Sequence, residues 1–385
     1  MDYKNFVILK KKLYLLLQKQ TKPTNMTKKY AILSFFAISL LFVFSCTDND
    51  DEEYIPISPV TVDLTQVPYE NLSDYHFFEG EMKDQKPSLD VLPYIPASTL
   101  FTDYAHKKRF IWIPKGVKST YNGDGNVLEL PVGSAIIKTF YYDNVQPENT
   151  TRIIETRIMI RKSTGWIFAE YIWNEAQTEA TLDMSRSFTN IEFVNENGDL
   201  LNVNYRIPSE TECLTCHKRN DQPIPIGIKP QNLNFNYNYG VETKNQLQKW
   251  IENGLLENTL PETINSTVNY NDTSQPLELR VRSYVDMNCA HCHHEGSHCD
   301  YRPIRLAFDE TTNPANLGVC IPPQEDINSA LTNIITPANK NRSVMYYRLS
   351  ATDESVRMPL LGRSIVHTEG IELLEQWINT LEPCD

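Results

Sequence analysis

The chain has 385 residues, with a hydrophobic fraction of 41% and a charged fraction of 22%, values that exclude an intrinsically disordered protein. Its formal charge is −13. An acidic surface repels phosphate backbones, so we expect no nucleic acid partner. A chain of this length predicts two or three domains.

The N-terminus has the features of an export signal. Two lysines precede an apolar run at 31–44, and Ser45 precedes Cys46. This order of basic, apolar and small residues is typical of a secretory signal. We therefore exclude residues 1–45 from the fold, as an upstream segment and signal peptide, and expect the protein outside the cytoplasm.

The end of the apolar run, FVFSC, resembles a bacterial lipobox. This resemblance implies that Cys46 is acylated, so that a lipid anchors the mature protein to a bacterial membrane, facing the periplasm or the cell surface. An ordinary cleaved signal and an uncleaved membrane anchor are the alternatives. Residues 46–100 begin with an acidic run and continue with many Pro, Ser and Asp residues, which predicts a tether and an irregular segment.

Residues 101–208 have the pattern of β-structure. Seven short runs rich in β-branched and aromatic residues are separated by turn sequences such as NGDGN, KSTG and NENGD; the runs are FIWIP, VLELPV, AIIKTFYYD, RIIETRIMIRK, GWIFAEYIWN, IEFVN and LLNVNYRI. The spacing predicts an antiparallel β sandwich or barrel-like domain.

After Pro208 the periodicity changes to that of helices. Helical stripes of apolar residues occupy 243–254, 276–291 and 368–381, with Thr368 as an N-cap candidate. We expect an α+β, multidomain protein whose C-terminal part is α-helical. We divide this part into segments 209–275 and 276–385.

Each segment contains a Cys-x-x-Cys-His motif: CLTCH at 213–217 and CAHCH at 289–293. Two thiols at this spacing can add to the two vinyl groups of a haem, and the histidine that follows then ligates the iron. The motifs predict two covalently attached haem c groups. The thioether residues would be Cys213, Cys216, Cys289 and Cys292, and the iron ligands His217 and His293.

Two other uses of these cysteines were considered. A four-cysteine zinc site usually separates its pairs by about 15–20 residues, whereas the pairs here, at 213–216 and 289–292, lie much farther apart. A thiol-disulfide redox pair would be expected in a βαβ setting, which neither motif has. The spacing and the export signal both favour haem.

The sixth iron ligand differs between the two motifs. Downstream of the second, Met358 precedes a proline and would complete haem two. Downstream of the first, Leu260-Pro261 occupies the place expected for Met-Pro, so haem one has an open distal position or takes a ligand from elsewhere. The donors considered are His76, His106, Met82, Met159, Met184, Met345 and the later histidines.

The remaining cysteines are less informative. Cys299 and Cys320 flank an insertion after the second motif, and in an oxidising compartment they could form a disulfide or remain free. Cys384 is expected to lie in a frayed terminus.

With these motifs, the sequence resembles a family of bacterial dihaem c-type cytochromes in which a β-rich domain precedes two cytochrome c segments. The stretches that carry the resemblance include LPVGSAIIKTFYY, ECLTCH, NQLQKWIENG, RVRSYVDMNCAHCH and RMPLLG. It implies tandem cytochrome c-like haem domains and single-electron transfer with a redox protein partner, a donor or acceptor dehydrogenase. The alternatives are a haem enzyme with an open site on haem one and a binding protein that uses its β domain.

Overall fold

The computed structural model describes residues 56–384, so the predicted signal and Cys46 lie outside the described residues. The chain divides into two units, Met1–Ile57 and Ser58–Asp385. No helix in the described part of the chain is long and apolar enough to cross a membrane.

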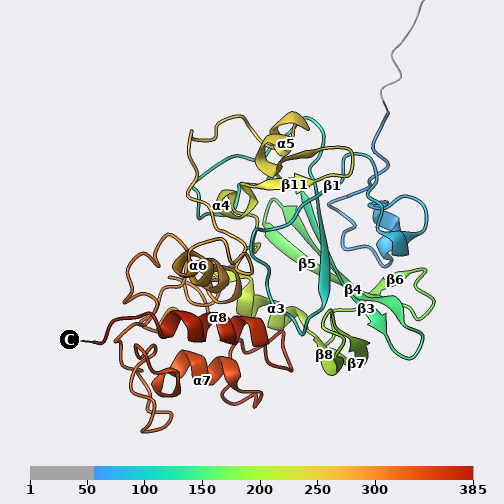
Figure 1. Cartoon of the computed structure of the whole chain (residues 1–385). Coiled ribbons are helices and arrows are strands. Elements are labelled where there is room, and N and C mark those ends of the chain that lie inside the picture. Colours follow the sequence, from blue (N-terminus) through green and yellow to red (C-terminus); the bar gives the residue numbers. More distant parts are fainter. Residues whose placement is uncertain (1–55, 385) are drawn as a thin grey trace, which may run out of the picture. The chain divides into compact units, whose positions relative to one another are not determined.

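The core of the second unit is one eight-stranded antiparallel sheet in the order β1-β2-β3-β4-β5-β6, with β7 pairing with both β3 and β8 (Figure 1). The strands are β1 (Leu92–Pro93), β2 (His106–Trp112), β3 (Ala135–Val145), β4 (Thr150–Lys162), β5 (Gly165–Trp173), β6 (Ala180–Leu182), β7 (Ser187–Val194) and β8 (Leu200–Ile207). Two small hairpins follow, β9 (Lys218–Arg219) with β10 (Gln222–Pro223) and β11 (Asn236–Asn238) with β12 (Thr243–Asn245).

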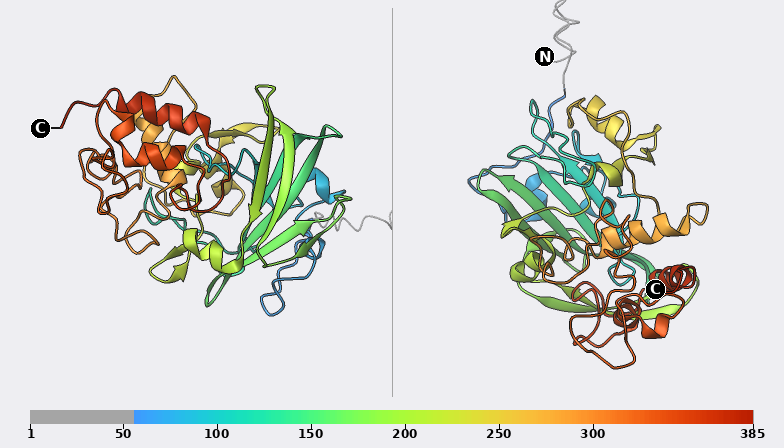
Figure 2. Two further views of the ribbon diagram at one scale, coloured as in Figure 1. Left: turned by 90° about the horizontal axis from the view of Figure 1, so that it is seen from below. Right: turned by 90° about the vertical axis from the view of Figure 1, so that its left-hand side faces the viewer.

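Both faces of the sheet are covered. On one face Phe110, Ile137 and Ile158 pack with Tyr75 and Phe77 from the segment before β1, which contains the 3-10 helices η1 (Leu72–Tyr75) and η2 (Met82–Asp84). Figures 1 and 2 show this blue segment on one side of the sheet and helices α6, α7 and α8 on the other. The alternation of side chains along the strands therefore gives the sheet two buried faces.

The helices are short: α3 (Glu210–Cys216), α4 (Pro230–Leu233), α5 (Gln246–Glu252), α6 (Leu277–Asn288), α7 (Val344–Ser350) and α8 (Thr368–Ile378), with the 3-10 helix η3 (Lys340–Arg342) before α7. The three predicted helical stripes correspond to α5, α6 and α8, which confirms those helices. Leu374 and Trp377 of α8 pack with Val281 and Val285 of α6, as large apolar residues at helical spacing do. The N-cap of α8 is His367, and Thr368 is its first residue.

The predicted fold class is wrong in two respects. The β-rich region forms one sheet and not a sandwich or barrel, and the run VLELPV makes only an isolated bridge through Glu129. The C-terminal part is not a pair of helical cytochrome c-like domains, because the described residues after 208 contain six short helices joined by long irregular segments. The helical periodicity is local to three stretches, and the Pro- and Asn-rich sequence between them does not continue it.

Candidate functional site

The first Cys-x-x-Cys-His motif lies on α3 and its C-terminal end. Ser209 is the N-cap residue of α3, and the carboxylate of Glu212 in the first turn accepts a hydrogen bond from the backbone N–H of Ser209 at 3.0 Å. The helix contains Cys213 and Cys216, and His217 is its C-cap residue. The His217 Nδ1 atom lies 3.0 Å from the carbonyl oxygen of Ile224. This contact makes Nδ1 the protonated nitrogen and leaves Nε2 available as a ligand.

A cavity adjoins this motif, and the β-sheet forms one of its walls. Its lining includes Cys213, Cys216 and His217 together with Met159 and Phe168 from β4 and β5. Met159 and Phe168 are cross-strand partners, and the Phe168 ring centroid lies 5.6 Å from that of His217. The sheet thus supplies the surface that faces the first motif.

A row of charged residues crosses the same wall of the cavity. Arg109, Lys138, Arg157 and Glu170 are successive cross-strand partners on β2, β3, β4 and β5, and all four line the cavity. Because directly paired residues share a face, the register places these four side chains on one side of the sheet.

One carboxyl group in this row is buried without a partner. Glu155 accepts hydrogen bonds from Arg157 and from the Tyr205 hydroxyl, whereas neither Glu170 oxygen has a partner among the described residues. Glu170 is 2% exposed, and burial raises the pKa of its carboxyl to about 10. The group is therefore protonated at neutral pH.

The second motif follows α6 and lines a separate cavity. This cavity brings together Cys289, His293 and Met358, and it is also lined by Met345. The His293 Nδ1 atom is buried and has no hydrogen-bond partner in the described part of the chain. Met358 thus lies on the same cavity as the second motif, and its role as an iron ligand stays a prediction. Met345, a sequence candidate for the first site, lies at the second.

The two motifs meet at their second cysteines. Ligand atoms of Cys216, His291 and Cys292 lie within 4.8 Å of one another, and the Cys292 sulfur lies 3.3 Å from the carbonyl oxygen of Thr215. The Asn220 N–H donates to the carbonyl of Gly296 at 2.8 Å, which joins the segments that follow the motifs. Residues far apart in the sequence thus form one continuous site.

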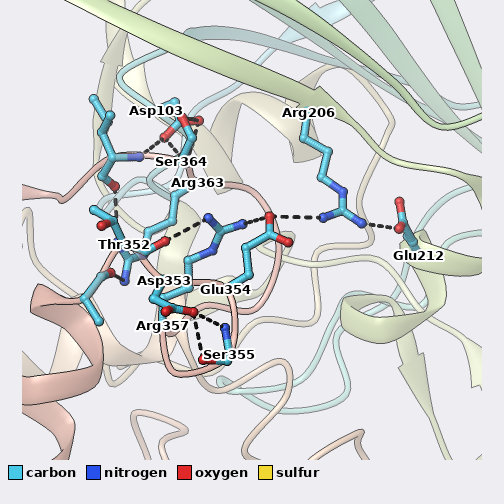
Figure 3. A network of polar contacts seen from close by, with 12 residues as sticks. Asp103, Arg206, Glu212, Thr352, Asp353, Glu354, Ser355, Arg357, Arg363 and Ser364 are labelled. Atoms are coloured by element: carbon cyan, nitrogen blue, oxygen red, sulfur yellow. Dashed lines mark hydrogen bonds and ion pairs between the residues drawn. The ribbon is translucent and has the colours of Figure 1, made fainter.

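Figure 3 shows a polar network that runs from Glu212 through Arg206 to Glu354 and Arg357. Arg206 of β8 pairs with Glu212 of α3 and lies 3.9 Å from Glu354, which pairs with Arg357 at 2.8 Å. Arg363 then donates to the carbonyl oxygen of Met358 at 2.9 Å. These contacts hold α3 and the segment around Met358 against the same part of the sheet.

The Asp103 carboxylate fixes this segment from the sheet side. It accepts hydrogen bonds from the backbone N–H of Ser364, at 2.6 and 2.8 Å, and from the Ser364 hydroxyl at 2.9 Å (Figure 3). The backbone N–H of Ile365 donates to it at 3.1 Å. These three hydrogen bonds to one carboxylate fix the position of residue 364 relative to residue 103.

The donor groups fit covalent haem attachment. Burial lowers the pKa values of His217 and His293 to about 4, so both imidazoles are neutral, the form that ligates a metal. Each motif presents its first cysteine and its histidine to its own cavity. Burial raises the pKa values of Cys213 and Cys289 to about 12. The hydrogen-bond contact with Cys292 instead lowers the pKa of the Cys216 thiol.

The structure brings together cysteines of both motifs, which bears on the zinc alternative. The sequence separation suggested independent pairs, yet Cys216 and Cys292 lie together with His291. Cys213 and Cys289 are not part of that group. In the described part of the chain the four motif cysteines therefore do not assemble into a four-cysteine zinc site, which needs four ligands around one ion.

The structure also reduces the number of candidate residues for the predicted sixth iron ligand at the first motif. Leu260 packs against a hydrophobic cluster around Trp250 and does not line the first cavity. Of the donors considered from the sequence, Met159 and His291 line that cavity, and Met287 of α6 lines it as well. Met159 was one of several candidates in the sequence, and the strand register selects it by bringing it to the motif, whereas Glu170 and Met287 were not among those candidates.

The predicted pairing of Cys299 with Cys320 is wrong. Cys320 forms a disulfide with Cys384, at an S–S distance of 2.05 Å, and Cys299 is a buried free thiol. Cys299 contacts the second motif, since its backbone N–H donates to the carbonyl oxygen of Cys292 at 2.9 Å. The C-terminus is thus tied to the insertion after the second motif.

Comparison of the chain with protein-family models, with curated proteins and with solved structures finds no match.

Proposed function

We propose that the protein is an exported dihaem c-type cytochrome that transfers single electrons, exchanging them with a redox protein partner such as a dehydrogenase. In this proposal it acts outside the cytoplasm and is attached to a bacterial membrane through a lipid on Cys46. Bound haem supplies an iron centre that accepts and releases one electron.

Cys213 and Cys216 would attach haem one with His217 as its ligand, and the hydrogen-bond contact with Ile224 would fix the orientation of that ring. Cys289 and Cys292 would attach haem two, with His293 and Met358 as its ligands. The cavity around Met358 is lined mainly by apolar side chains, such as Ile304, Leu306 and Leu349, which exclude water. A methionine ligand raises the reduction potential of a haem.

The observation that carries the proposal is the contact between two complete motifs. Cys216 and Cys292 lie within 4.8 Å of one another, so covalently attached haems would have neighbouring edges. This arrangement favours electron exchange between two sites. It is not required of two unrelated metal sites, which gain nothing from proximity.

The test is the mass of the purified holoprotein, made with haem attachment machinery, before and after removal of each cysteine pair. The wild type should contain two haems, and Cys213→Ser with Cys216→Ser should contain one, as should Cys289→Ser with Cys292→Ser. Haem staining of a denaturing gel checks that attachment is covalent. Retention of zinc or another metal at the Cys216, His291 and Cys292 group, without haem, would refute the proposal.

A second function, a haem enzyme acting at haem one, is favoured by one observation. The first cavity is lined by Arg157, which is partly exposed and pairs with Glu155, and by the unpartnered carboxyl of Glu170. An acid and a cation next to an open haem position are suited to reduction of a small ligand such as peroxide. Carbon monoxide and cyanide titrations test this function, because both ligands require an open iron position.

A further inference from the structure

We propose that a cleft next to the first motif is a carboxylate-binding site formed by Arg161 and Arg219. The cleft has a volume of about 670 Å³, within the range of small-molecule sites, and its lining includes Cys216 and His291. It is distinct from the cavity that contains His217, although the two share Cys216, His291 and the loop around Gly227.

The two guanidinium groups are the basis of this assignment. Both Arg161 and Arg219 line the cleft and are partly buried, and neither side chain makes a hydrogen bond or ion pair with another described residue. In a chain with a formal charge of −13, carboxylates are abundant, so two unpaired arginines facing one cleft are unexpected. A guanidinium offers planar donors that match a carboxylate.

The other charged groups at the cleft already have partners. Lys229 pairs with Asp286 at 2.9 Å, and Glu129 accepts a hydrogen bond from Asn122 at 3.0 Å. Asn122 is neutral, so Glu129 keeps its negative charge, and the two arginines still leave the cleft with a positive charge. A ligand with one or two carboxylates would complement it.

Regular structure fixes both arginines in place. Arg161 is on β4 opposite Trp166 of β5, and its guanidinium lies 5.9 Å from the Trp166 ring centroid. Arg219 is on the β9–β10 hairpin opposite Gln222. Because the sheet supplies one arginine and the segment after His217 the other, the site exists only when these two parts are joined.

Two sources can supply the carboxylates. One is a free small molecule, such as a dicarboxylate that enters the cleft. The other is the pair of propionate groups of haem one, and only this source rests on the proposed function. The recognition chemistry is the same in both cases, so the experiment has an arm for each source.

The first arm is calorimetric titration of the holoprotein with succinate, with the neutral diamide succinamide as a matched ligand. If the site takes free carboxylates, succinate should bind and succinamide should not. Arg161→Gln and Arg219→Gln should each weaken succinate binding by about tenfold or more, the loss of a charge-assisted hydrogen bond. Arg152→Gln is the control, since Arg152 is on the same strand but pairs with the exposed Glu175.

The second arm is the midpoint potential of haem one in the same variants. If its propionates occupy the site, succinate should not bind. Loss of either positive charge should then lower the potential, because a nearby cation favours the reduced state. Binding that is equal for succinate and succinamide, or unchanged in both variants, overturns the proposal. Absence of binding together with unchanged potentials overturns it as well. Absence of haem refutes the proposed function instead, and the succinate titration still tests the cleft.

Discussion

The cavities next to the two Cys-x-x-Cys-His motifs are lined by different parts of the chain. The cavity of the second motif is lined by residues that follow it, from Arg302 to Met358. The cavity of the first motif is lined by a sheet that precedes it, through residues such as Met159 and Glu170. The second site is therefore local in sequence, whereas the first depends on the whole sheet.

The segment with Leu260 has a packing role in this arrangement. That segment packs its apolar residues, with Trp250 fully buried, against Leu92, Ile111 and their neighbours. The segment packs on the edge of the sheet, and β4 and β5 form the wall of the first cavity.

The largest effect that separates the two sites is expected from Met358→Leu. This change should abolish the methionine–iron charge-transfer band and lower the potential of haem two by a sizeable part of the about 0.8 V range that axial ligands span. Visible and near-infrared spectra with a redox titration provide the measurement. Met345→Leu, in the same cavity, and Met159→Leu, in the first, are matched controls. Loss of the band in Met345→Leu, with the band kept in Met358→Leu, contradicts the assignment.

Removal of the disulfide should affect the second site more than the first. The bond joins Cys320 to Cys384, and Pro323, Gln324, Glu325 and Ile327 next to Cys320 line the second cavity. Cys320→Ser with Cys384→Ser should lower the free energy of unfolding by about 2–4 kcal/mol, since the bridge closes a long loop. Denaturant unfolding followed by circular dichroism measures this loss. Cys299→Ser, a buried free thiol, serves as the control for a cysteine change outside the bridge; an equal loss there would argue against the role of the bridge.

The sequence predicted the local features of both sites but not the wall of the first. The motifs, α6 and α8 follow from spacing and periodicity within short stretches. Arg109, Lys138, Arg157 and Glu170 lie on four strands, and only their register brings them together. The partner of Cys320 was likewise missed, because the connectivity of cysteines does not follow from their order in the sequence.

The packing of helices α6 and α8 against the segment before β2 should depend on pH through His367. This residue stacks on Phe101 at 4.1 Å between ring centroids, and its Nδ1 lies 3.0 Å from the Tyr284 hydroxyl. Burial lowers the pKa of His367 to about 4 from its ordinary 6.5, so the unfolded chain takes up a proton first as the pH falls.

Stability is then fully present above about pH 6.5 and is lost as the pH falls toward 4, by at most about 3 kcal/mol. His367→Gln should remove this part of the pH dependence, which urea unfolding at several pH values measures. His298→Gln, at an exposed position, should leave it unchanged. An identical pH profile in wild type and His367→Gln would remove His367 as the cause.

The smallest effect is expected from Arg206→Gln, at the centre of the polar network that runs from Glu212 to Arg357. Arg206 pairs with Glu212 on α3, next to Cys213, and lies 3.9 Å from Glu354, close to Met358 (Figure 3). Glu354 is exposed, so the contact with it contributes little, and the pair with Glu212 should account for most of a loss of about 1 kcal/mol in unfolding free energy. A double-mutant cycle with Glu212→Gln measures that pair, and a cycle with Glu354→Gln measures the longer contact. A larger coupling free energy with Glu354 than with Glu212 would mean that the second site stabilises the first. The two regions would then depend on each other more than the separate linings of their cavities imply.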